Sequence, residues 1–489
     1  MLAALVGAGI VVFWRDNIVD PDCLYHAGHA RLYWERGPFF RDFPWASASI
    51  ISRERSDLWW SLHVLLAPTG LFSDPVLGMR VGIAALVGIH LLVLGLAYRR
   101  LELSPWWALL SATVSSGALS RLATLRPQTI SAALLPLLFA ELWRRSVPTA
   151  CAVGAALGLF HPTLGYLILP ITMTTGVFAG RKKTKWPEVA ALGCALAFAF
   201  VRPGVVGGAH LLKVQTIDLF AVRRLNVILN FGNELAKADR GYFLFGALVP
   251  TILLGLALVL VRKPTFKSPA PAALLLSLAF LGVFVVVTKR GVDTFAPFAM
   301  LTFALVVGSW KRFPVWALVV PIALCAFATN VYAKDKLKVK PITHRFEGAA
   351  KWLAANSRPN EVVYHTVWSH FADLFFWNRK DRYLGGMDPM FQWAVSPSNY
   401  WLTTPIHPKR YAGKIGPLNP AETQKAERPL YELVPKIFGA RYVMAGSGEP
   451  QFVRALRDDK AHYALRYQGG DGFVFEILPI PAASNLPTR

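Results

Sequence analysis

Cysteine is scarce in this chain, and several catalytic and nucleotide-binding motifs are missing from it. The four cysteines among 489 residues, Cys23, Cys151, Cys194 and Cys325, do not support a disulfide framework or a metal–thiolate site. The sequence contains no Walker-type or dinucleotide glycine pattern, no HExxH pair and no nucleophile elbow. These absences argue against ATP-driven transport and against zinc-dependent hydrolysis.

Acidic residues are also few, since 29 Asp and Glu stand against 52 Lys and Arg, a formal net charge of +23. An excess of this size can indicate nucleic-acid binding. Here much of the positive charge lies in short loops between apolar segments, and the rest is scattered. The charge therefore indicates membrane topology and attraction to anionic lipid or phosphate groups, and not nucleic acid.

Hydrophobic residues make up 54% of the chain, and the mean hydropathy is +0.39. They occur in blocks of about 17 to 22 residues, the length with which a helix crosses a bilayer. We expect a polytopic α-helical membrane protein with about eleven transmembrane helices. The candidate spans are 1–14, 77–98, 103–120, 128–143, 147–160, 163–180, 187–201, 242–261, 270–288, 294–309 and 314–332.

The first of these blocks, residues 1–14, is short and lacks both a basic n-region and a small-residue cleavage site. We interpret it as a retained anchor and not as a signal peptide, with a trimmed start as the alternative.

Basic residues predict the orientation of the chain in the membrane. They follow the second, fourth, sixth, eighth and tenth candidate spans, at Arg99-Arg100, Arg144-Arg145, Arg181 to Lys185, Arg262 to Lys267 and Lys311-Arg312. Lys and Arg mark cytoplasmic loops. We therefore expect the protein to lie in the plasma (inner) membrane with its N-terminus in the cytoplasm. The first loop (15–76), the loop at 202–241 and the C-terminal part then face outward.

The C-terminal part has a charged, mixed composition that is typical of a domain outside the membrane. Residues 346–356 have the pattern of a helix, and 361–364, 441–444 and 472–477 have the pattern of strands. We therefore predict two domains, a transmembrane domain at 1–333 and an extracytoplasmic α/β domain at 334–489.

The first outer loop contains the strongest candidates for catalysis. Pro21 precedes a helical pattern in which Asp22 and His26 are four residues apart and share one face. Asp22 could act as a general base, or could bind a divalent cation together with Asp20, and Asp57 could complete the site. The alternative is that Asp22 only caps a helix and that His26 is an interface residue.

Several arginines stand at the predicted outer ends of the spans, where positive charge is not needed for topology. They are Arg121, Arg126, Arg202 and Arg290. Arginine binds phosphate through two parallel hydrogen bonds, so these residues are candidate ligands of a lipid phosphate. Alternatively, each of them extends toward lipid headgroups. His161, before Pro162, could face the same region.

Five short segments resemble the GT-C superfamily of membrane glycosyltransferases. Residues 20–31 are similar to the D-x-x-Y-H-x-x-x-A-R opening of the first outer loop in oligosaccharyltransferase catalytic subunits and their bacterial relatives, and 56–60 to a later acidic, aromatic segment of that loop. Residues 125–128 and 289–298 look like the entries of two later spans, and 383–391 resembles a GxDP stretch of the outer domain.

The resemblance implies a fold and an activity. It implies an inverting transfer of a sugar from a polyprenyl-phosphate donor to a glycan, lipid or protein acceptor, with Asp22 as base or metal ligand and Asp57 as a second acidic residue. Arg126 and Arg290, together with Arg121, would bind the donor phosphate. The cation would be Mg²⁺ or Mn²⁺ if one is used. The W-W-D acceptor signature is missing, so protein N-glycosylation is not implied.

Two other classes of function remain open at this point. One is a transporter or a lipid- or glycan-binding membrane scaffold without turnover, although the charges stand at predicted outer ends of spans and not at the midplane that transporters use. The other is a GT-C relative that binds its ligands but has lost catalysis.

Overall fold

The computed structural model divides the chain into two compact units. The helical unit comprises residues 1–39, 58–205 and 231–340, and the mixed unit comprises 40–57, 206–230 and 341–489. The residues that the structure describes are 18, 20–122, 124–179, 186–224, 237–260, 268–308, 342–365, 367–397, 399–400 and 429–479. The candidate spans 1–14 and 314–332 lie outside these described residues.

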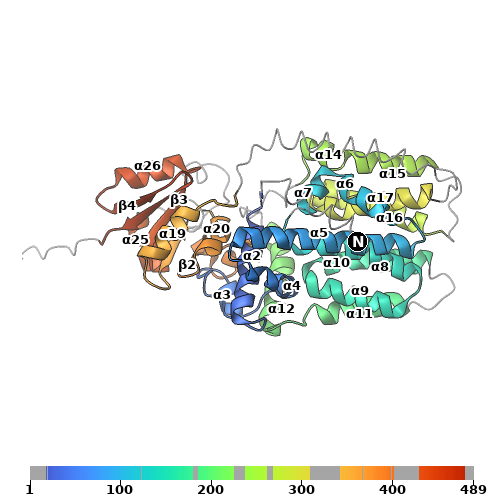
Figure 1. The fold of residues 1–489 in the computed structure, drawn as a ribbon, viewed down its shortest axis with the longest axis horizontal. Coiled ribbons are helices and arrows are strands. Elements are labelled where there is room, and N and C mark those ends of the chain that lie inside the picture. Colours follow the sequence, from blue (N-terminus) through green and yellow to red (C-terminus); the bar gives the residue numbers. More distant parts are fainter. Residues whose placement is uncertain are drawn as a thin grey trace, which may run out of the picture. The chain divides into compact units, whose positions relative to one another are not determined.

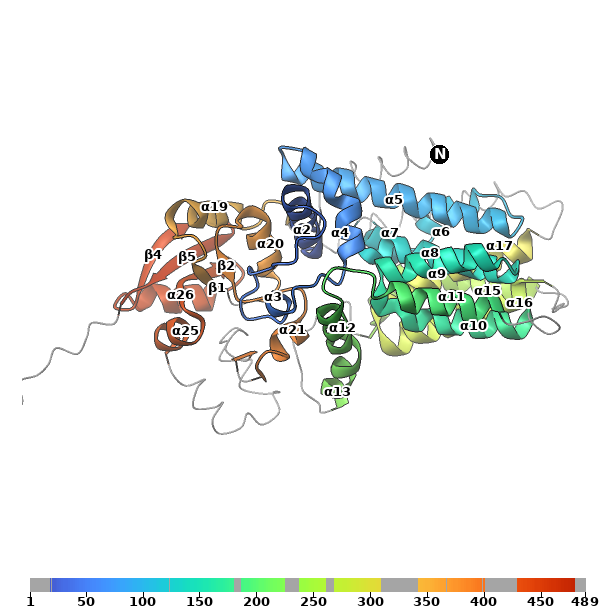
Figure 2. The same cartoon turned by 90° about the horizontal axis from the view of Figure 1, so that it is seen from below.

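The long apolar runs of the helical unit form helices that lie side by side in one bundle (Figures 1 and 2). Their bounds are α5 Pro75–Arg100, α6 Trp107–Thr113, α7 Ser116–Leu122, α8 Pro127–Trp143, α9 Val147–Phe160, α10 Gly165–Phe178, α11 Trp186–Phe198, α14 Arg240–Gly246, α15 Leu248–Leu260, α16 Ala270–Gly282 and α17 Val292–Val307. Two further helices, α2 (Asp22–Arg36) and α4 (Trp60–Leu66), come from the first loop. Each of the nine candidate spans within the described residues therefore corresponds to helix.

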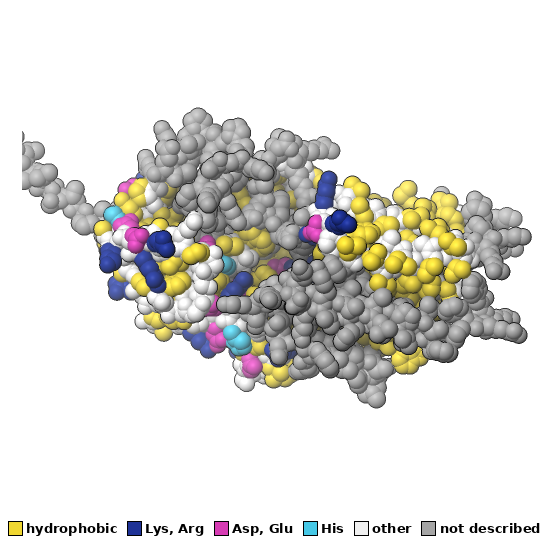
Figure 3. Space-filling view, turned by 90° about the horizontal axis from the view of Figure 1, so that it is seen from above, with side chains coloured by type: hydrophobic (Ala, Val, Ile, Leu, Met, Phe, Trp, Pro, Cys, Tyr) yellow, Lys and Arg dark blue, Asp and Glu magenta, His cyan; other side chains and the backbone are white. Residues whose placement is uncertain are grey.

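Length and composition suit these helices to a bilayer. Among the described residues, four helical stretches are long and apolar enough to cross a membrane: 75–100, 270–287 and 289–307 in the helical unit, and 205–222, which apart from its first residue belongs to the mixed unit. Four shorter apolar helices accompany them. Hydrophobic side chains such as Val259, Met173 and Val286 are well exposed on the helical unit, and Figure 3 shows that they dominate its visible face. The chain is thus a polytopic helical membrane protein, while the total of eleven spans stays a prediction.

Small residues allow the helices α9 and α11 to pack closely against each other. Gly154 and Gly158 on α9 are four residues apart and meet Ala191 and Ala195 on α11. A methyl group on Gly158 would collide with the carbonyl oxygen of Ala195. This small-xxx-small pattern lets two backbones approach within a membrane, where apolar burial alone gives little drive for helix association.

The candidate span 103–120 is interrupted between α6 and α7. The hydroxyl of Ser115 accepts a hydrogen bond from the backbone N–H of Ala118 at 3.0 Å and donates one to the carbonyl of Gly246. Gly117 lies against Gly246, where its Cβ position is 3.2 Å from the Gly246 Cα. The break therefore brings the first turn of α7 against the end of α14.

The mixed unit is built on a five-stranded sheet with the order β2-β1-β3-β5-β4. Strand β1 (Val362–His365) runs parallel to β2 (Arg382–Tyr383) and β3 (Ala440–Gly446), whereas β5 (Gly472–Ile477) runs antiparallel to β3 and β4 (Tyr463–Gln468). The predicted helix and strands of the C-terminal domain are therefore present.

Helices cover both faces of this sheet (Figure 2). Helix α19 (Glu347–Asn356) packs on β4 and β5, while α25 (Leu430–Phe438) and α26 (Pro450–Asp458) pack near β3. The core between the sheet and the latter two helices includes Tyr364, Val443, Phe475, Val434 and Leu456, all buried. Lys, Arg, Asp and Glu are interspersed on the surface of the mixed unit in Figure 3.

Two segments that were predicted to belong to the outer loops 15–76 and 202–241 are part of the mixed unit. Residues 40–57 extend the sheet at β2, because the N–H of Ser47 and that of Ala48 donate to the carbonyls of Tyr383 and Leu384 at 2.8 and 2.6 Å. Residues 206–224 are helical: they comprise α12 (Val205–Lys213) from its second residue on, a π-helical turn at Val214–Asp218, and α13 (Leu219–Arg224). The C-terminal domain thus folds with parts of both long loops.

Candidate active site

The start of α2 carries an ion-pair cluster made of three residues that the sequence singled out. Arg126 directly precedes α8, whose first residue is Pro127, and its guanidinium points at Asp20 and Asp22. Its Nη2 lies 2.7 Å from Asp20 Oδ1 and 2.7 Å from Asp22 Oδ2, and its Nε donates to Asp20 Oδ2. The structure therefore brings the candidate base, the candidate metal ligands and a candidate phosphate ligand together.

The contacts within this cluster determine which further ligands Asp20, Asp22 and Arg126 can bind in this conformation. Asp20 accepts two hydrogen bonds from the guanidinium in a fork, the strong arrangement for arginine and a carboxylate. All three side chains are at most 15% exposed, so water weakens the pairing little. Asp20 and Asp22 could bind a cation only in exchange for contacts with Arg126, and their role as metal ligands stays a prediction.

Cys23 connects the start of α2 to the segment that precedes α8. Its Sγ accepts a hydrogen bond from the N–H of Leu125 at 3.2 Å, which fastens α2 to the segment that carries Arg126. The side chain is fully buried, and desolvation raises the pKa of the Cys23 thiol well above its usual value. Cys23 is therefore a neutral structural group and not a nucleophile.

The other candidate phosphate ligands lie near helix ends in the same unit. Arg121 on α7 pairs with Asp293 in the first turn of α17, with its Nε 2.7 Å from each carboxylate oxygen. Arg290 lies in the 3₁₀ turn Lys289–Gly291 before α17. Its neighbour Lys289 is buried and pairs with Asp239 at 2.7 Å. The sequence interpretation missed Asp239 and the partnership of Asp293, because both pairings join distant segments.

Arg202 and His161 have structural partners. Arg202 is buried and donates to the carbonyls of Leu58 and Gly158. His161, also buried, lies with its Nδ1 2.9 Å from the hydroxyl of Ser131. These contacts favour a packing role for both residues.

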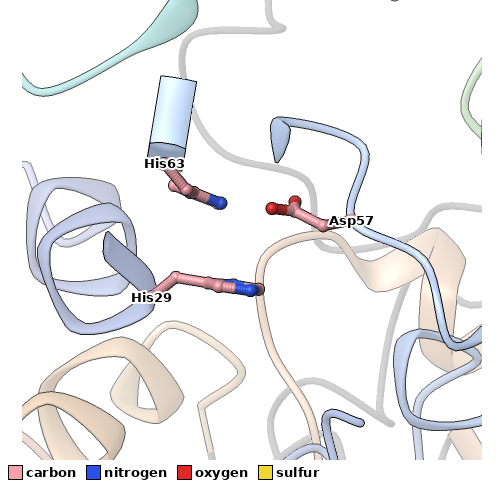
Figure 4. Close-up of side chains that lie close together, drawn as sticks. All are labelled: His29, Asp57 and His63. Atoms are coloured by element: carbon pink, nitrogen blue, oxygen red, sulfur yellow. The ribbon is translucent and has the colours of Figure 1, made fainter. Parts of the chain in front are cut away.

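His26 belongs to a buried histidine cluster and not to the Asp22 ion pairs. Its Nδ1 lies 2.7 Å from Nε2 of His63 on α4, at hydrogen-bond distance. The ring of His29 stacks on that of His63, with centroids 4.3 Å apart and planes 15° apart (Figure 4). Asp22 and His26 therefore share a helix face, yet their measured partners differ.

Imidazole nitrogens are good ligands for divalent metals, so this cluster is a second place where a cation could bind. The ligand nitrogens of His29 and His63 lie within 4.8 Å of each other, close enough for both to bind one cation. The sequence interpretation named only His26; the signal it missed was the histidine three residues later on the same helix.

Asp57, the third predicted catalytic residue, is the last residue of the 40–57 segment in the mixed unit. Its side chain is buried. Its part in catalysis stays a prediction.

A small, mainly apolar cavity with a few polar groups lies among α5, α6, α7, α8 and α17 of the helical unit. Its volume is about 20 Å³, enough for about one water, and the Arg121–Asp293 pair, His90 and Gln128 line it. The Oε1 of Gln128 is buried and has no hydrogen-bond partner among the described residues. A water in this cavity would satisfy that atom and hydrate the ion pair.

These features define a polytopic membrane protein with a mixed α/β C-terminal domain. An ion-paired acidic cluster lies at the start of its first-loop helix, α2. Its fold matches solved structures of ArnT from Cupriavidus metallidurans over 97% of both chains. The structure bound to undecaprenyl phosphate gives a TM-score of 0.55 at 14% identity, and the apo structure gives 0.54 at 13%. No protein-family model and no curated protein matches the chain. The likeness shows that the chain has the fold of these ArnT structures.

Proposed function

We propose that this protein is a membrane glycosyltransferase that transfers a sugar from a polyprenyl-phosphate donor to an acceptor. The observation that carries the proposal is the cluster of Asp20, Asp22 and Arg126. It combines a carboxylate for proton transfer with a guanidinium for phosphate at the start of the first-loop helix. The likeness in fold to a protein crystallised with undecaprenyl phosphate supports the same donor class.

In the proposed reaction, a hydroxyl of the acceptor attacks the anomeric carbon of the sugar from the face opposite the phosphate. The new C–O bond forms as the bond to the phosphate oxygen breaks, so the configuration inverts. Asp22 accepts the hydroxyl proton, and polyprenyl phosphate leaves with the bonding electron pair. Arg126, Arg121 and Arg290 stabilise the charge on the leaving phosphate.

Arg126 and Arg121 bind carboxylates in the conformation seen, so the donor phosphate has to replace part of these contacts. A divalent cation, Mg²⁺ or Mn²⁺, would supply further neutralisation of the phosphate when bound. Asp22 and Asp20, or the histidine cluster, are the residues that would hold it.

The same proposal includes the orientation of the chain. The N-terminus is cytoplasmic, eleven helices cross the plasma membrane, and the C-terminal domain is extracytoplasmic. It rests on the basic residues after every second span. A cysteine introduced at residue 454, at the surface of the mixed unit, tests this orientation directly by accessibility labelling. Labelling of that cysteine only after permeabilisation would contradict the orientation.

The decisive experiment measures transfer from a panel of radiolabelled polyprenyl-phosphate sugars by the purified protein. Asp22→Asn should abolish transfer while the fold is retained. Glu35→Gln, which removes one carboxylate of the surface pair with Arg31 on the same helix, is the matched control and should transfer normally. Failure of the wild-type protein both to transfer sugar and to bind any donor would favour a transporter or a membrane scaffold.

A further inference from the structure

The mixed unit contains a polar cavity that the proposed transfer chemistry does not use. Its volume is about 150 Å³. Three segments that are far apart in sequence line it: the first-loop segment with Arg53, residues 392–400 with Gln392, Asn399 and Tyr400, and the end of α25 with Phe438. All of these residues belong to one compact unit.

The walls of this cavity are held by the fold. Helix α21 (Pro389–Trp393) is capped by Asp388, whose Oδ1 accepts from the N–H of Met390 at 2.8 Å. The N–H of Ile50 donates to the carbonyl of Phe391 at 3.0 Å, which fastens the first-loop segment along α21. Gln392 is only 3% exposed, so the polar wall is preformed.

Among the described residues that line the cavity, Arg53 is the charged one. Arg53 lies on α3 (Ile51–Glu54), and in the part of the chain that the structure describes no carboxylate pairs with it. The neighbouring carboxylates are engaged: Asp42 with Arg55 at 2.9 Å, and Glu54 with His210 at 2.7 Å. The guanidinium of Arg53 is therefore available to an anionic group, which it can bind through two hydrogen bonds.

The remaining lining groups fit a sugar ring. The amide side chain of Asn399 offers a donor and an acceptor side by side, as neighbouring sugar hydroxyls require. Phe438 adds an apolar aromatic side chain to the lining, which suits the C–H groups of such a ring. The cavity is too small and too polar for a polyprenyl chain.

We propose that this cavity binds one saccharide residue that carries a negatively charged group, as a subsite for the acceptor. The acceptor role rests on the proposed transferase function, whereas the binding itself does not. Carboxylate and phosphate share the chemistry that Arg53 recognises, so the experiment includes both.

The test is calorimetric titration of the full-length protein in lipid nanodiscs with glucuronate, glucose 1-phosphate, methyl glucoside and inorganic phosphate. At least one anionic hexose should bind more tightly than methyl glucoside and inorganic phosphate. Arg53→Gln should weaken that binding by about tenfold, the worth of one charge-assisted contact. Asn399→Ala should weaken binding of every hexose, and Arg454→Gln, a matched change at a surface position outside the cavity, should have no effect.

Three results would overturn the proposal: no binding of any hexose, equal binding by Arg53→Gln and the wild-type protein, or inorganic phosphate binding as tightly as the best hexose. The last result would indicate a simple anion site. An anionic hexose that binds to a protein unable to use any polyprenyl-phosphate donor would refute the proposed transferase function and leave the cavity assignment intact.

Discussion

If Arg126 binds the donor phosphate as proposed, Asp20 competes with that phosphate, and replacing Asp20 with asparagine should tighten the binding of undecaprenyl phosphate. One guanidinium faces two carboxylates in this cluster, and the local net charge is therefore negative. Removing one unit charge about 5 Å from a phosphate changes their interaction by about 1 to 3 kcal/mol for effective dielectric constants of about 80 to 20. The expected gain in affinity is about fivefold to a hundredfold.

Equilibrium binding of radiolabelled undecaprenyl phosphate to the protein in nanodiscs measures this effect. Asparagine keeps an oxygen that can accept a hydrogen bond from Arg126, so the geometry should survive Asp20→Asn. Glu35→Gln removes the same charge about 20 Å farther along α2, beyond the screening length at physiological salt, and should leave the affinity unchanged. An unchanged or weaker affinity of Asp20→Asn would refute the competition and indicate that Asp20 orients Arg126 for the phosphate.

Three further changes test the packing and the charge of each unit. Gly158→Ala should lower the melting temperature in detergent, because its methyl group would push α9 away from the Ala195 carbonyl at a cost of about 1 to 3 kcal/mol. His63→Phe keeps an aromatic ring but removes a buried hydrogen bond, and should lower the free energy of unfolding by about 1 to 3 kcal/mol in chemical denaturation. Burial, opposed by the Arg345 ion pair, raises the pKa of Asp373 from 3.8 to about 6, so folding favours its protonated form. The stability from this proton is full below the unfolded pKa and is lost as the pH rises through about 6, about 3 kcal/mol in all. Hydrogen exchange of the sheet at pH 4 and pH 7 should show that loss in the wild type relative to Asp373→Asn, and equal pH dependence in the two would contradict it.

The apolar runs predicted the helices well, because a bilayer-crossing helix needs only local sequence to satisfy its backbone. The candidate span 147–160 has the same bounds as α9, and 128–143 differs from α8 by one residue. The break between α6 and α7 was missed, since it depends on the contact of Ser115 with the distant Gly246. Hydropathy carries no information about such a partner.

The sheet was predicted in part for a related reason. Strand β5 at 472–477 is a short run rich in aromatic and β-branched residues and was found. The edge strand β4 has exposed residues at half of its positions, including Arg466, and an irregular register beside Leu465. The first-loop segment that joins the sheet at Tyr383 is more than 300 residues away in sequence. The sequence could therefore not assign that segment to the C-terminal domain.

The candidate site shows that the roles of charged residues cannot be assigned from the sequence one residue at a time, because the roles depend on the ion-pair partners. The sequence indicated acids for catalysis and arginines for phosphate as separate groups, and the structure pairs Arg126 with Asp20 and Asp22 and pairs Arg121 with Asp293. With Lys289 bound to Asp239, the three ion-paired cations meet four carboxylates. A phosphate entering this region therefore meets little net positive charge from these groups, and its affinity must come from exchanging hydrogen bonds with a carboxylate already in place. That exchange is why loss of the Asp20 charge should strengthen donor binding, whereas loss of Asp22, if it accepts the proton, should stop transfer.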